Sequence, residues 1–193
     1  MLTPLCRTPR VWMADDFVSR DECEHILACG ADAERLAAAG VTTRHDHTGF
    51  WFDMPIADDV VAAEIARRTC DALGLENDFG TTLRFRHYEP GQSHPAHVDC
   101  YTIGHSHLVA TALVYLTDTE AGGETVFPRA LPEPLIVRPA RGRLVTWLNY
   151  YPNGARDPSS FHESRAVISG TKVTITNFIY APLGCAGARP GVR

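Results

Sequence analysis

The spacing of hydrophobic residues along the chain changes from a helical period in the first third to a period of two in the rest. After Ser19, apolar residues recur every three or four positions, and Ser19 with Glu22 forms a capping-box pattern. This pattern predicts a helix that ends at Gly40. The same period predicts a second helix over 58–73, and the aromatic-rich segment 41–54 between them is expected to be a strand.

From residue 81 onward, short segments rich in Val, Leu, Thr and aromatic residues alternate with turns that contain Gly and Pro. Many short strands at a spacing of roughly 8–12 residues are typical of a sandwich or a barrel. We therefore predict a mainly β protein with a double-stranded β-helix (jelly-roll) core and N-terminal helices packed on one face. The expected strands are 81–88, 96–101, 108–116, 124–127, 135–138, 143–148, 164–168 and 172–180.

The chain is expected to form a single domain over 1–193, with a helical part at 10–75, a jelly-roll core at 81–181 and a loose tail at 182–193. Its 45% hydrophobic and 21% charged residues are ordinary for a globular domain. No segment has the pattern of a secretory signal or a membrane span, so we expect a cytoplasmic protein with reduced cysteines. A net charge of −5 without a basic run argues against nucleic acid as a partner, and the oligomeric state stays open.

Two histidines and one aspartate form a candidate metal site. His97 and Asp99 are two positions apart, so in a strand their side chains would share one face. His162 precedes another expected strand. Two imidazoles and one carboxylate on facing strands would form the facial triad that suits non-haem Fe(II). Spacing alone leaves open whether these residues are instead hydrogen-bonded members of a sheet.

Lys172, the only lysine of the chain, opens the last expected strand. A cation on the strand face that lines a barrel needs an anionic partner, because burial of an unpaired charge is costly. A dicarboxylate co-substrate would supply that partner. The alternative is a lysine at a strand end whose amine extends into solvent. The residues that share its strand face are Thr174, Thr176, Phe178 and Tyr180.

These residues lie in stretches that resemble the prolyl 4-hydroxylase family of Fe(II)/2-oxoglutarate-dependent dioxygenases. The resemblance extends from about residue 10 to residue 181, with the motifs in the order of the family. The matching stretches are DFVSRDEC at 16–23, RHYEPGQ at 86–92, HVD at 97–99, LVYLTD at 113–118, GGETVFP at 122–128, PARGRLVTW at 139–147, HES at 162–164 and GTK at 170–172.

The resemblance implies that His97, Asp99 and His162 bind Fe(II) and that Lys172 pairs with the distal carboxylate of 2-oxoglutarate. The implied reaction converts 2-oxoglutarate and O2 to succinate and CO2 and hydroxylates a C–H bond. Ascorbate is expected as the reductant. Because related halogenating enzymes lack the carboxylate of the triad, the presence of Asp99 favours hydroxylation.

Three further residues are implied around the co-substrate. Tyr88 and Thr125 would form hydrogen bonds with the distal carboxylate of 2-oxoglutarate. Tyr115 is another candidate for this pocket, and plain packing within the sheet is its alternative role.

The chain departs from the family where a peptide substrate is usually anchored. His94 replaces an expected tyrosine, Leu108 an expected arginine and Phe178 an expected tryptophan. These changes reduce the aromatic and cationic groups that hold a peptide, although Leu108 and Phe178 would still offer an apolar pocket for a pyrrolidine ring. Arg44 is a fourth candidate substrate residue, near the substrate entrance.

We therefore predict a hydroxylase that oxidises an unactivated C–H bond of a prolyl or similar amino-acid unit. The first alternative keeps the chemistry but takes a free amino acid or a natural-product intermediate as the substrate. A second alternative, of another class, is a catalytically inactive jelly-roll binding module. A cupin-like metalloenzyme without 2-oxoglutarate would leave Lys172 unexplained.

Overall fold

The computed structural model describes residues 1–32, 43–46 and 48–184. Strands predominate among its elements, as the period-two pattern predicts. In chain order the elements are β1 (Thr3–Arg7), β2 (Arg10–Ala14), α1 (Arg20–Ala31), β3 (Thr43–Asp46), β4 (Gly49–Pro55), α3 (Val60–Leu73), β5 (Thr82–Tyr88), β6 (His94–His97), β7 (Thr102–Ile103), β8 (Ser106–Tyr115), β9 (Ala121–Gly122), β10 (Thr125–Phe127), β11 (Leu135–Val137), β12 (Leu144–Leu148), the 3-10 helix η1 (Pro158–Ser160), β13 (His162–Ser164), β14 (Val167–Ser169) and β15 (Lys172–Ala181).

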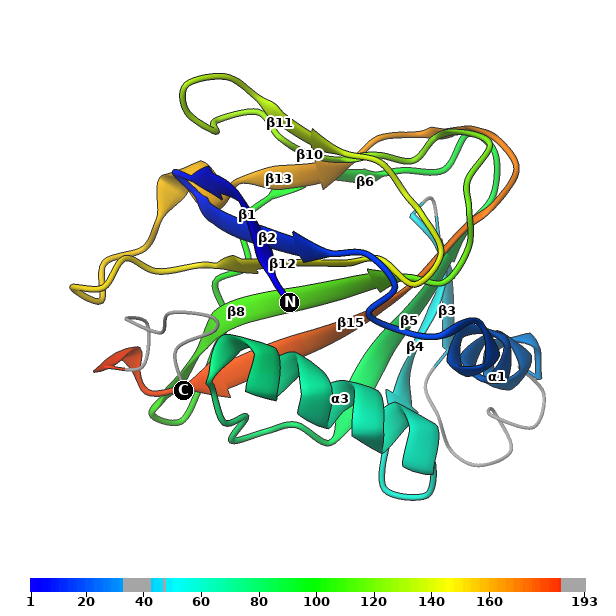
Figure 1. The fold of residues 1–193 in the computed structure, drawn as a ribbon, viewed down its shortest axis with the longest axis horizontal. Coiled ribbons are helices and arrows are strands. Elements are labelled where there is room, and N and C mark those ends of the chain that lie inside the picture. Colours follow the sequence, from blue (N-terminus) through cyan, green and yellow to red (C-terminus); the bar gives the residue numbers. More distant parts are fainter. Residues whose placement is uncertain (33–42, 47, 185–193) are drawn as a thin grey trace.

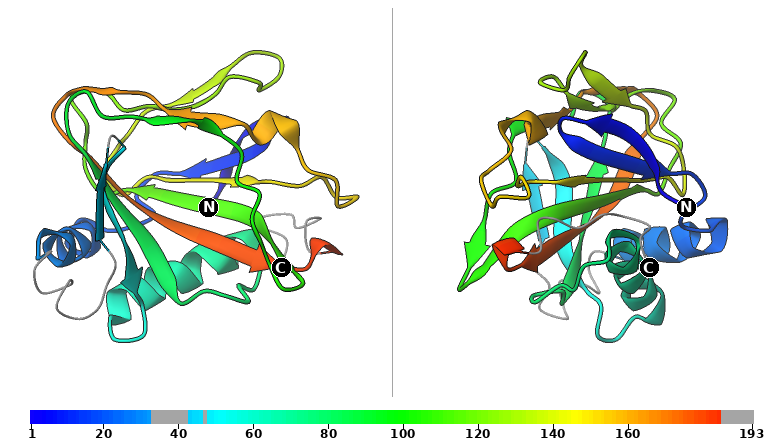
Figure 2. Two further views of the ribbon diagram at one scale, coloured as in Figure 1. Left: turned by 180° about the vertical axis from the view of Figure 1, so that it is seen from behind. Right: turned by 60° about the vertical axis from the view of Figure 1, so that its left-hand side comes forward.

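Two antiparallel sheets face each other (Figure 1). The larger sheet has the strand order β1-β2-β12-β8-β15-β5-β4-β3, with β7 paired to β8, and the smaller sheet has the order β11-β10-β13-β6. Helices α1 and α3 lie on the side of the larger sheet that faces away from the smaller one (Figure 2). The predicted fold class, a double-stranded β-helix with N-terminal helices on one face, is confirmed.

Alternation along β15 separates an apolar core from a polar-lined cavity. Val173, Ile175 and Ile179 are buried in one hydrophobic cluster with the helix residues Ile26 and Ile65. The large sheet is therefore held to its helices by burial of apolar side chains. The alternate residues of β15, which line a cavity between the sheets, are Lys172, Thr174, Thr176, Phe178 and Tyr180.

The predicted starts of both helices are confirmed. The Ser19 hydroxyl accepts a hydrogen bond from the Glu22 N–H, and the Glu22 carboxylate accepts one from the Ser19 N–H, which completes the capping box. Asp59 caps α3, and Gly74 ends that helix in the left-handed conformation at a φ of 65°. Among the described residues, no helix combines the length and hydrophobicity that crossing a membrane requires.

The N-terminal part, which the pattern predicts to be helical apart from one strand, contains more strands than expected. β1 and β2 form a hairpin whose second strand pairs with β12, and the expected strand 41–54 is a hairpin of β3 and β4 that pairs with β5. β1 and β2 are short and depend on a partner far along the chain, so no local period identifies them. Helix α1 ends at Ala31 rather than at Gly40, and residues 33–42 lie outside the described part.

Two strands of the second half also differ from expectation. β6 ends at His97, so Asp99 lies just beyond the strand rather than on it. The expected strand 164–168 is divided into β13 and β14, and His162 is the first residue of β13. Of the predicted loose tail, only 182–184 belong to the described residues.

Candidate active site

His97, Asp99 and His162 converge at one wall of the cavity. Antiparallel pairing of β13 with β6 places His162 opposite His97, with the ring centroids 4.4 Å apart. The Asp99 carboxylate oxygens lie 3.4 Å from Nε2 of His97 and 3.8 Å from Nε2 of His162. One potential ligand atom of each residue lies within 4.8 Å of the other two, so the three could hold one metal ion.

Backbone carbonyls orient both imidazole rings. Nδ1 of His97 lies 2.9 Å from the carbonyl oxygen of Pro95, and Nδ1 of His162 lies 2.8 Å from that of Ser160. Because a carbonyl only accepts hydrogen bonds, each Nδ1 carries the hydrogen, and each ring in its neutral form presents a lone pair at Nε2. Both lone pairs are on the side of the carboxylate, as a metal site requires.

The charge of Asp99 is stabilised although its side chain is buried. Burial opposes the charge, but His162, His97 and the Thr111 hydroxyl, whose Oγ1 donates to Oδ2 at 2.7 Å, together lower the pKa of Asp99. Burial also lowers the pKa of His162, which favours its neutral form. An ionised carboxylate beside a neutral imidazole is the protonation state that binds a divalent cation.

The cavity has a volume of about 360 Å³ and takes its walls from both sheets. The smaller sheet contributes His97 and Ser164, and the larger sheet contributes Tyr88, Thr174 and Phe178. This volume is within the range of small-molecule sites in proteins.

Lys172 is a buried cation at the cavity wall, with only 1% of its surface exposed. Its Nζ donates a hydrogen bond to Oγ of Ser164 at 2.7 Å, and it lies 5.2 and 5.4 Å from the ring centroids of Tyr88 and Tyr115. Burial lowers the pKa of Lys172 to about 7. No carboxylate among the described residues forms an ion pair with it, which leaves room for an anionic ligand.

The other residues that the resemblance implies for binding 2-oxoglutarate lie around this lysine. Tyr88 lies opposite Lys172 in the pairing of β5 with β15, and both Tyr88 and Thr125 line the cavity. Tyr115 does not line it, and its hydroxyl donates to Oγ1 of Thr125 at 2.7 Å. Burial raises the pKa of Tyr115, so this hydroxyl stays protonated.

The four predicted substrate residues are distributed unevenly. His94 and Phe178 line the cavity, and burial together with His97 lowers the pKa of His94 to about 4. Leu108 is fully buried opposite Tyr180 and is not part of the lining, so the expected apolar pair of Leu108 and Phe178 is not formed there. Arg44 belongs to β3, but its side chain is outside the described part of the structure.

Several residues of the site were not identified from the sequence. Arg84, Arg86 and Ser164 line the cavity, and each is an even number of positions from a predicted residue on its own strand. Period-two alternation from Tyr88 and His162 could therefore have found them. Thr111 has no such signal, because its contact with the loop residue Asp99 joins segments from different parts of the chain.

The two arginines differ in their partners. Arg84 forms an ion pair with Asp53 and lies over the Trp51 ring, with 4.3 Å from Cζ to the ring centroid. Arg86 donates from Nη1 to the hydroxyl of Thr48 at 2.7 Å and forms no ion pair with a described carboxylate. The guanidinium of Arg86 also lines the cavity.

A double-stranded β-helix with two histidines, one carboxylate and a buried lysine around one cavity defines a metal-dependent oxygenase. Comparison with family models specifies the class, since residues 83–180 match the 2OG-Fe(II) oxygenase superfamily. The chain belongs to this superfamily. It is therefore a dioxygenase that depends on Fe(II) and 2-oxoglutarate and takes O2 and an organic substrate.

Individual relatives agree with the predicted resemblance to prolyl 4-hydroxylases. The chain is 28% identical to probable prolyl 4-hydroxylases 6 and 7 of Arabidopsis thaliana, over 93% of its own length and over 72% and 65% of theirs. In structure it is similar to a viral collagen prolyl hydroxylase from Paramecium bursaria Chlorella virus-1, determined as a 2OG complex, with a TM-score of 0.72, 23% identity and coverage of 92% and 99% of the two chains. A Pseudomonas putida prolyl-4-hydroxylase matches with a TM-score of 0.58, 15% identity and coverage of 90% and 93%.

Proposed function

We propose that this chain hydroxylates an unactivated C–H bond of a prolyl or similar amino-acid unit and converts 2-oxoglutarate and O2 to succinate and CO2. The observation that carries the proposal is that the His97–Asp99–His162 trio and the buried Lys172 line the same cavity. The similarity to Arabidopsis prolyl 4-hydroxylases supports the choice of substrate unit.

In this proposal His97, Asp99 and His162 hold Fe(II). Their fit rests on the donor set, two imidazole Nε2 lone pairs and one ionised carboxylate, which leaves the remaining coordination positions to ligands. When bound, the ion supplies the activation of O2.

Side chains behind the trio hold two of its members in place. Trp147 and Phe127 pack against the His162 ring at centroid distances of 4.6 and 5.6 Å, and Thr111 fixes the Asp99 carboxylate. A ligand set whose rotamers are locked by packing and hydrogen bonds needs little rearrangement when the ion binds.

Lys172 is the proposed partner of the distal carboxylate of 2-oxoglutarate. An ammonium group has three hydrogens, and one of them is used by Ser164. The Thr125 hydroxyl accepts from Tyr115, so its own hydrogen remains to be donated to the carboxylate. Tyr88 closes the same wall of the cavity. Tyr115 would then act as a positioning residue for Thr125.

Aromatic rings in the cavity lining favour a substrate that contains an apolar ring, such as a prolyl unit. Phe178, Tyr180 and Tyr101 line the cavity, and Tyr101 is 65% exposed. Their faces offer a surface for the C–H groups of a pyrrolidine, in place of the family anchors that this chain lacks.

A second candidate function is the same hydroxylation on a free amino acid or a related small acid. Arg86 favours it, because the guanidinium lines the cavity without a described carboxylate partner. The α-carboxylate of a free amino acid would supply that partner, whereas a residue within a peptide has none.

The deciding experiment measures succinate formed by purified protein with Fe(II), ascorbate, O2 and 2-oxoglutarate. Short peptides that contain proline and free amino acids are added one at a time. We expect substrate-dependent succinate in the wild type and its loss in Asp99→Ala. Arg7→Gln, a change at an exposed arginine of β1 outside the cavity, serves as the control and should retain full turnover.

Arg86→Gln then distinguishes between the two candidate substrate classes, free amino acids and peptides. If free amino acids are the substrates, this change should raise their KM at least about tenfold, the loss expected for a charge-assisted hydrogen bond. If peptides are the substrates, their KM should stay nearly unchanged. Wild-type protein that forms no succinate with any addition would contradict the proposed activity and favour the inactive binding module.

A further inference from the structure

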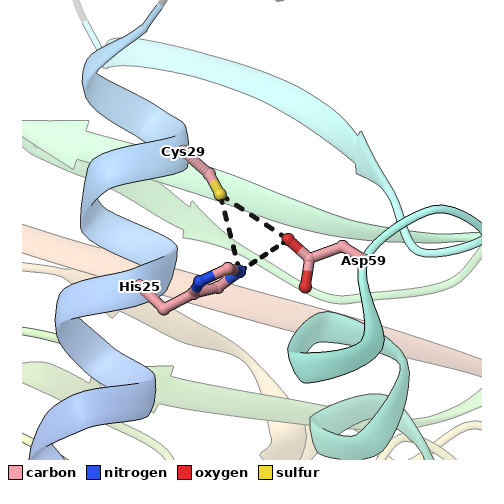
Figure 3. Close-up of side chains that lie close together, drawn as sticks. All are labelled: His25, Cys29 and Asp59. Carbon is pink, nitrogen blue, oxygen red and sulfur yellow. Dashed lines mark hydrogen bonds and ion pairs between the residues drawn. The ribbon is translucent and has the colours of Figure 1, made fainter.

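A second group of potential metal ligands lies away from the cavity, between the two helices. Figure 3 shows His25 and Cys29 one turn apart on α1, with their side chains directed at Asp59, the residue that caps α3. None of the three lines the active-site cavity. Imidazole, thiolate and carboxylate are the three ligand types that proteins use for zinc.

The three ligand atoms have nearly the spacing of a tetrahedral site. Sγ of Cys29 lies 3.8 Å from Nε2 of His25 and 3.6 Å from Oδ2 of Asp59, and Nε2 and Oδ2 are 2.8 Å apart. Zinc–ligand bonds of about 2.0 Å to nitrogen and oxygen and about 2.3 Å to sulfur correspond to separations of about 3.3 to 3.6 Å in a tetrahedron. The separation of 3.6 Å already fits, the one of 3.8 Å exceeds the range slightly, and the one of 2.8 Å needs to open by about half an ångström.

The same nitrogen of His25 faces both neighbours. In a nucleophilic triad the imidazole contacts the thiol through one ring nitrogen and the carboxylate through the other. Here the one ring nitrogen Nε2 contacts both Sγ of Cys29 and Oδ2 of Asp59. The arrangement therefore converges on a point rather than forming a relay, which favours a metal site over an activated cysteine.

The fold orients the Asp59 carboxylate for this role. Its Oδ1 accepts hydrogen bonds from the N–H groups of Val61 and Ala62 at 3.0 and 2.9 Å, which leaves Oδ2 toward His25 and Cys29. Burial opposes the carboxylate charge, but the Ala62 N–H and His25 lower the pKa of Asp59. A carboxylate that is ionised and held in one orientation by hydrogen bonds is prepared to bind a cation.

We propose that His25, Cys29 and Asp59 form a second metal site, for zinc or a similar divalent cation, with a fourth position open to water. The site lies where solvent reaches it, since the His25 side chain is 45% exposed. A bound ion would join α1 to α3 and so stabilise the helical layer without taking part in catalysis. The proposal does not depend on the substrate or activity of the main site.

Cobalt(II) tests this proposal, because it replaces zinc and gives an intense charge-transfer absorption only when a thiolate is a ligand. Full-length protein, freed of metal with a chelator, is titrated with cobalt. We expect two ions per chain and a thiolate band. Cys29→Ser should lose the band and bind one ion. Cys6→Ser, at a cysteine outside the cluster, should retain both.

Two further variants distinguish cobalt binding at the second site from a loss of the helix and from cobalt binding at the active site. Asp59→Asn keeps an oxygen that caps α3, so the helix is retained. The affinity of the second site for cobalt, followed by the thiolate band, should fall at least tenfold. Asp99→Ala should retain the band. Absence of a thiolate band from the wild type at millimolar cobalt, or an undiminished band in Cys29→Ser, would overturn the proposal.

Discussion

The ammonium group of Lys172 lies inside the protein with one hydroxyl and two aromatic rings around it, and its pKa is lowered to about 7. An isolated buried charge weakens the folded state, and its replacement by an apolar side chain of similar size is often neutral or stabilising. A lysine kept at such a cost indicates a role in ligand binding.

We expect Lys172→Met to separate stability from binding. The free energy of unfolding, measured without ligands by chemical denaturation, should stay the same or rise by up to about 4 kcal/mol. Binding of 2-oxoglutarate, measured by calorimetry on metal-loaded protein without O2, should weaken at least tenfold. A marked loss of stability would show instead that the lysine serves the fold.

The same lysine predicts how 2-oxoglutarate binding depends on pH. Only the protonated amine attracts the distal carboxylate. As the pH rises through about 7, the ligand-free protein loses this proton, so the dissociation constant should rise and approach tenfold per pH unit. In Lys172→Arg the guanidinium stays charged, and the constant should be flat over the same range. A flat profile in the wild type would contradict the proposed pairing.

At this scale the sequence predicted the trio and the lysine because residue type and strand alternation are local properties. Asp99 reaches the trio even though the strand that was expected to carry it ends at His97. Thr111 was not predicted, because threonine is common and only a tertiary contact shows that this one holds Asp99. Leu108 was misplaced relative to the cavity, since a motif position does not specify how deep a side chain is buried.

At the scale of elements, the approach of α1 to the larger sheet depends on the absence of a side chain. Gly30 is buried on α1, and a Cβ there would lie far inside van der Waals contact of the Phe85 ring on β5. Alanine is the better helix former, so local propensity alone favours the substitution. Packing opposes it.

We expect Gly30→Ala to destabilise the protein by about 1 to 3 kcal/mol, the usual cost of overpacking a core. Gly184→Ala, at a described glycine whose added Cβ would meet nothing within 4 Å, is the matched control and should be neutral. Both are measured as shifts of the urea midpoint at unchanged slope. A Gly30→Ala protein as stable as the wild type would mean that α1 moves freely against the sheet.

Helix α3 has its own boundary signals and was predicted correctly, whereas β1 and β2 have none and were not predicted. Helix α3 has Asp59 at its start and Gly74 at its end, so composition and caps define it locally. β1 contains a proline and β2 pairs with β12, so both depend on the assembled sheet. Strands this short carry almost no periodic signal of their own.

At the scale of the whole molecule, the proposed ligands connect the two sheets in two stages. His97 and His162 belong to the smaller sheet, and Asp99 follows it directly, whereas Lys172 and Tyr88 belong to the larger one. A metal ion alone would therefore strengthen one wall of the cavity. 2-Oxoglutarate, bound to the metal and to Lys172, would bridge both walls.

This division predicts additive steps in thermal stability. Metal should raise the melting temperature, and 2-oxoglutarate at about 100 times its dissociation constant should add about 2.7 kcal/mol, or about 5 to 10 °C for a chain of this size. In Lys172→Met, at the same concentrations, the metal step should remain and the 2-oxoglutarate step should fall to about half or less, because a tenfold weaker affinity leaves about 1.4 kcal/mol. Asp99→Ala should lose both steps, and Cys29→Ser should keep both when Fe(II) is the metal. A 2-oxoglutarate step of full size in Lys172→Met would mean that the co-substrate does not reach the larger sheet through this lysine, and the two-walled site would have to be revised.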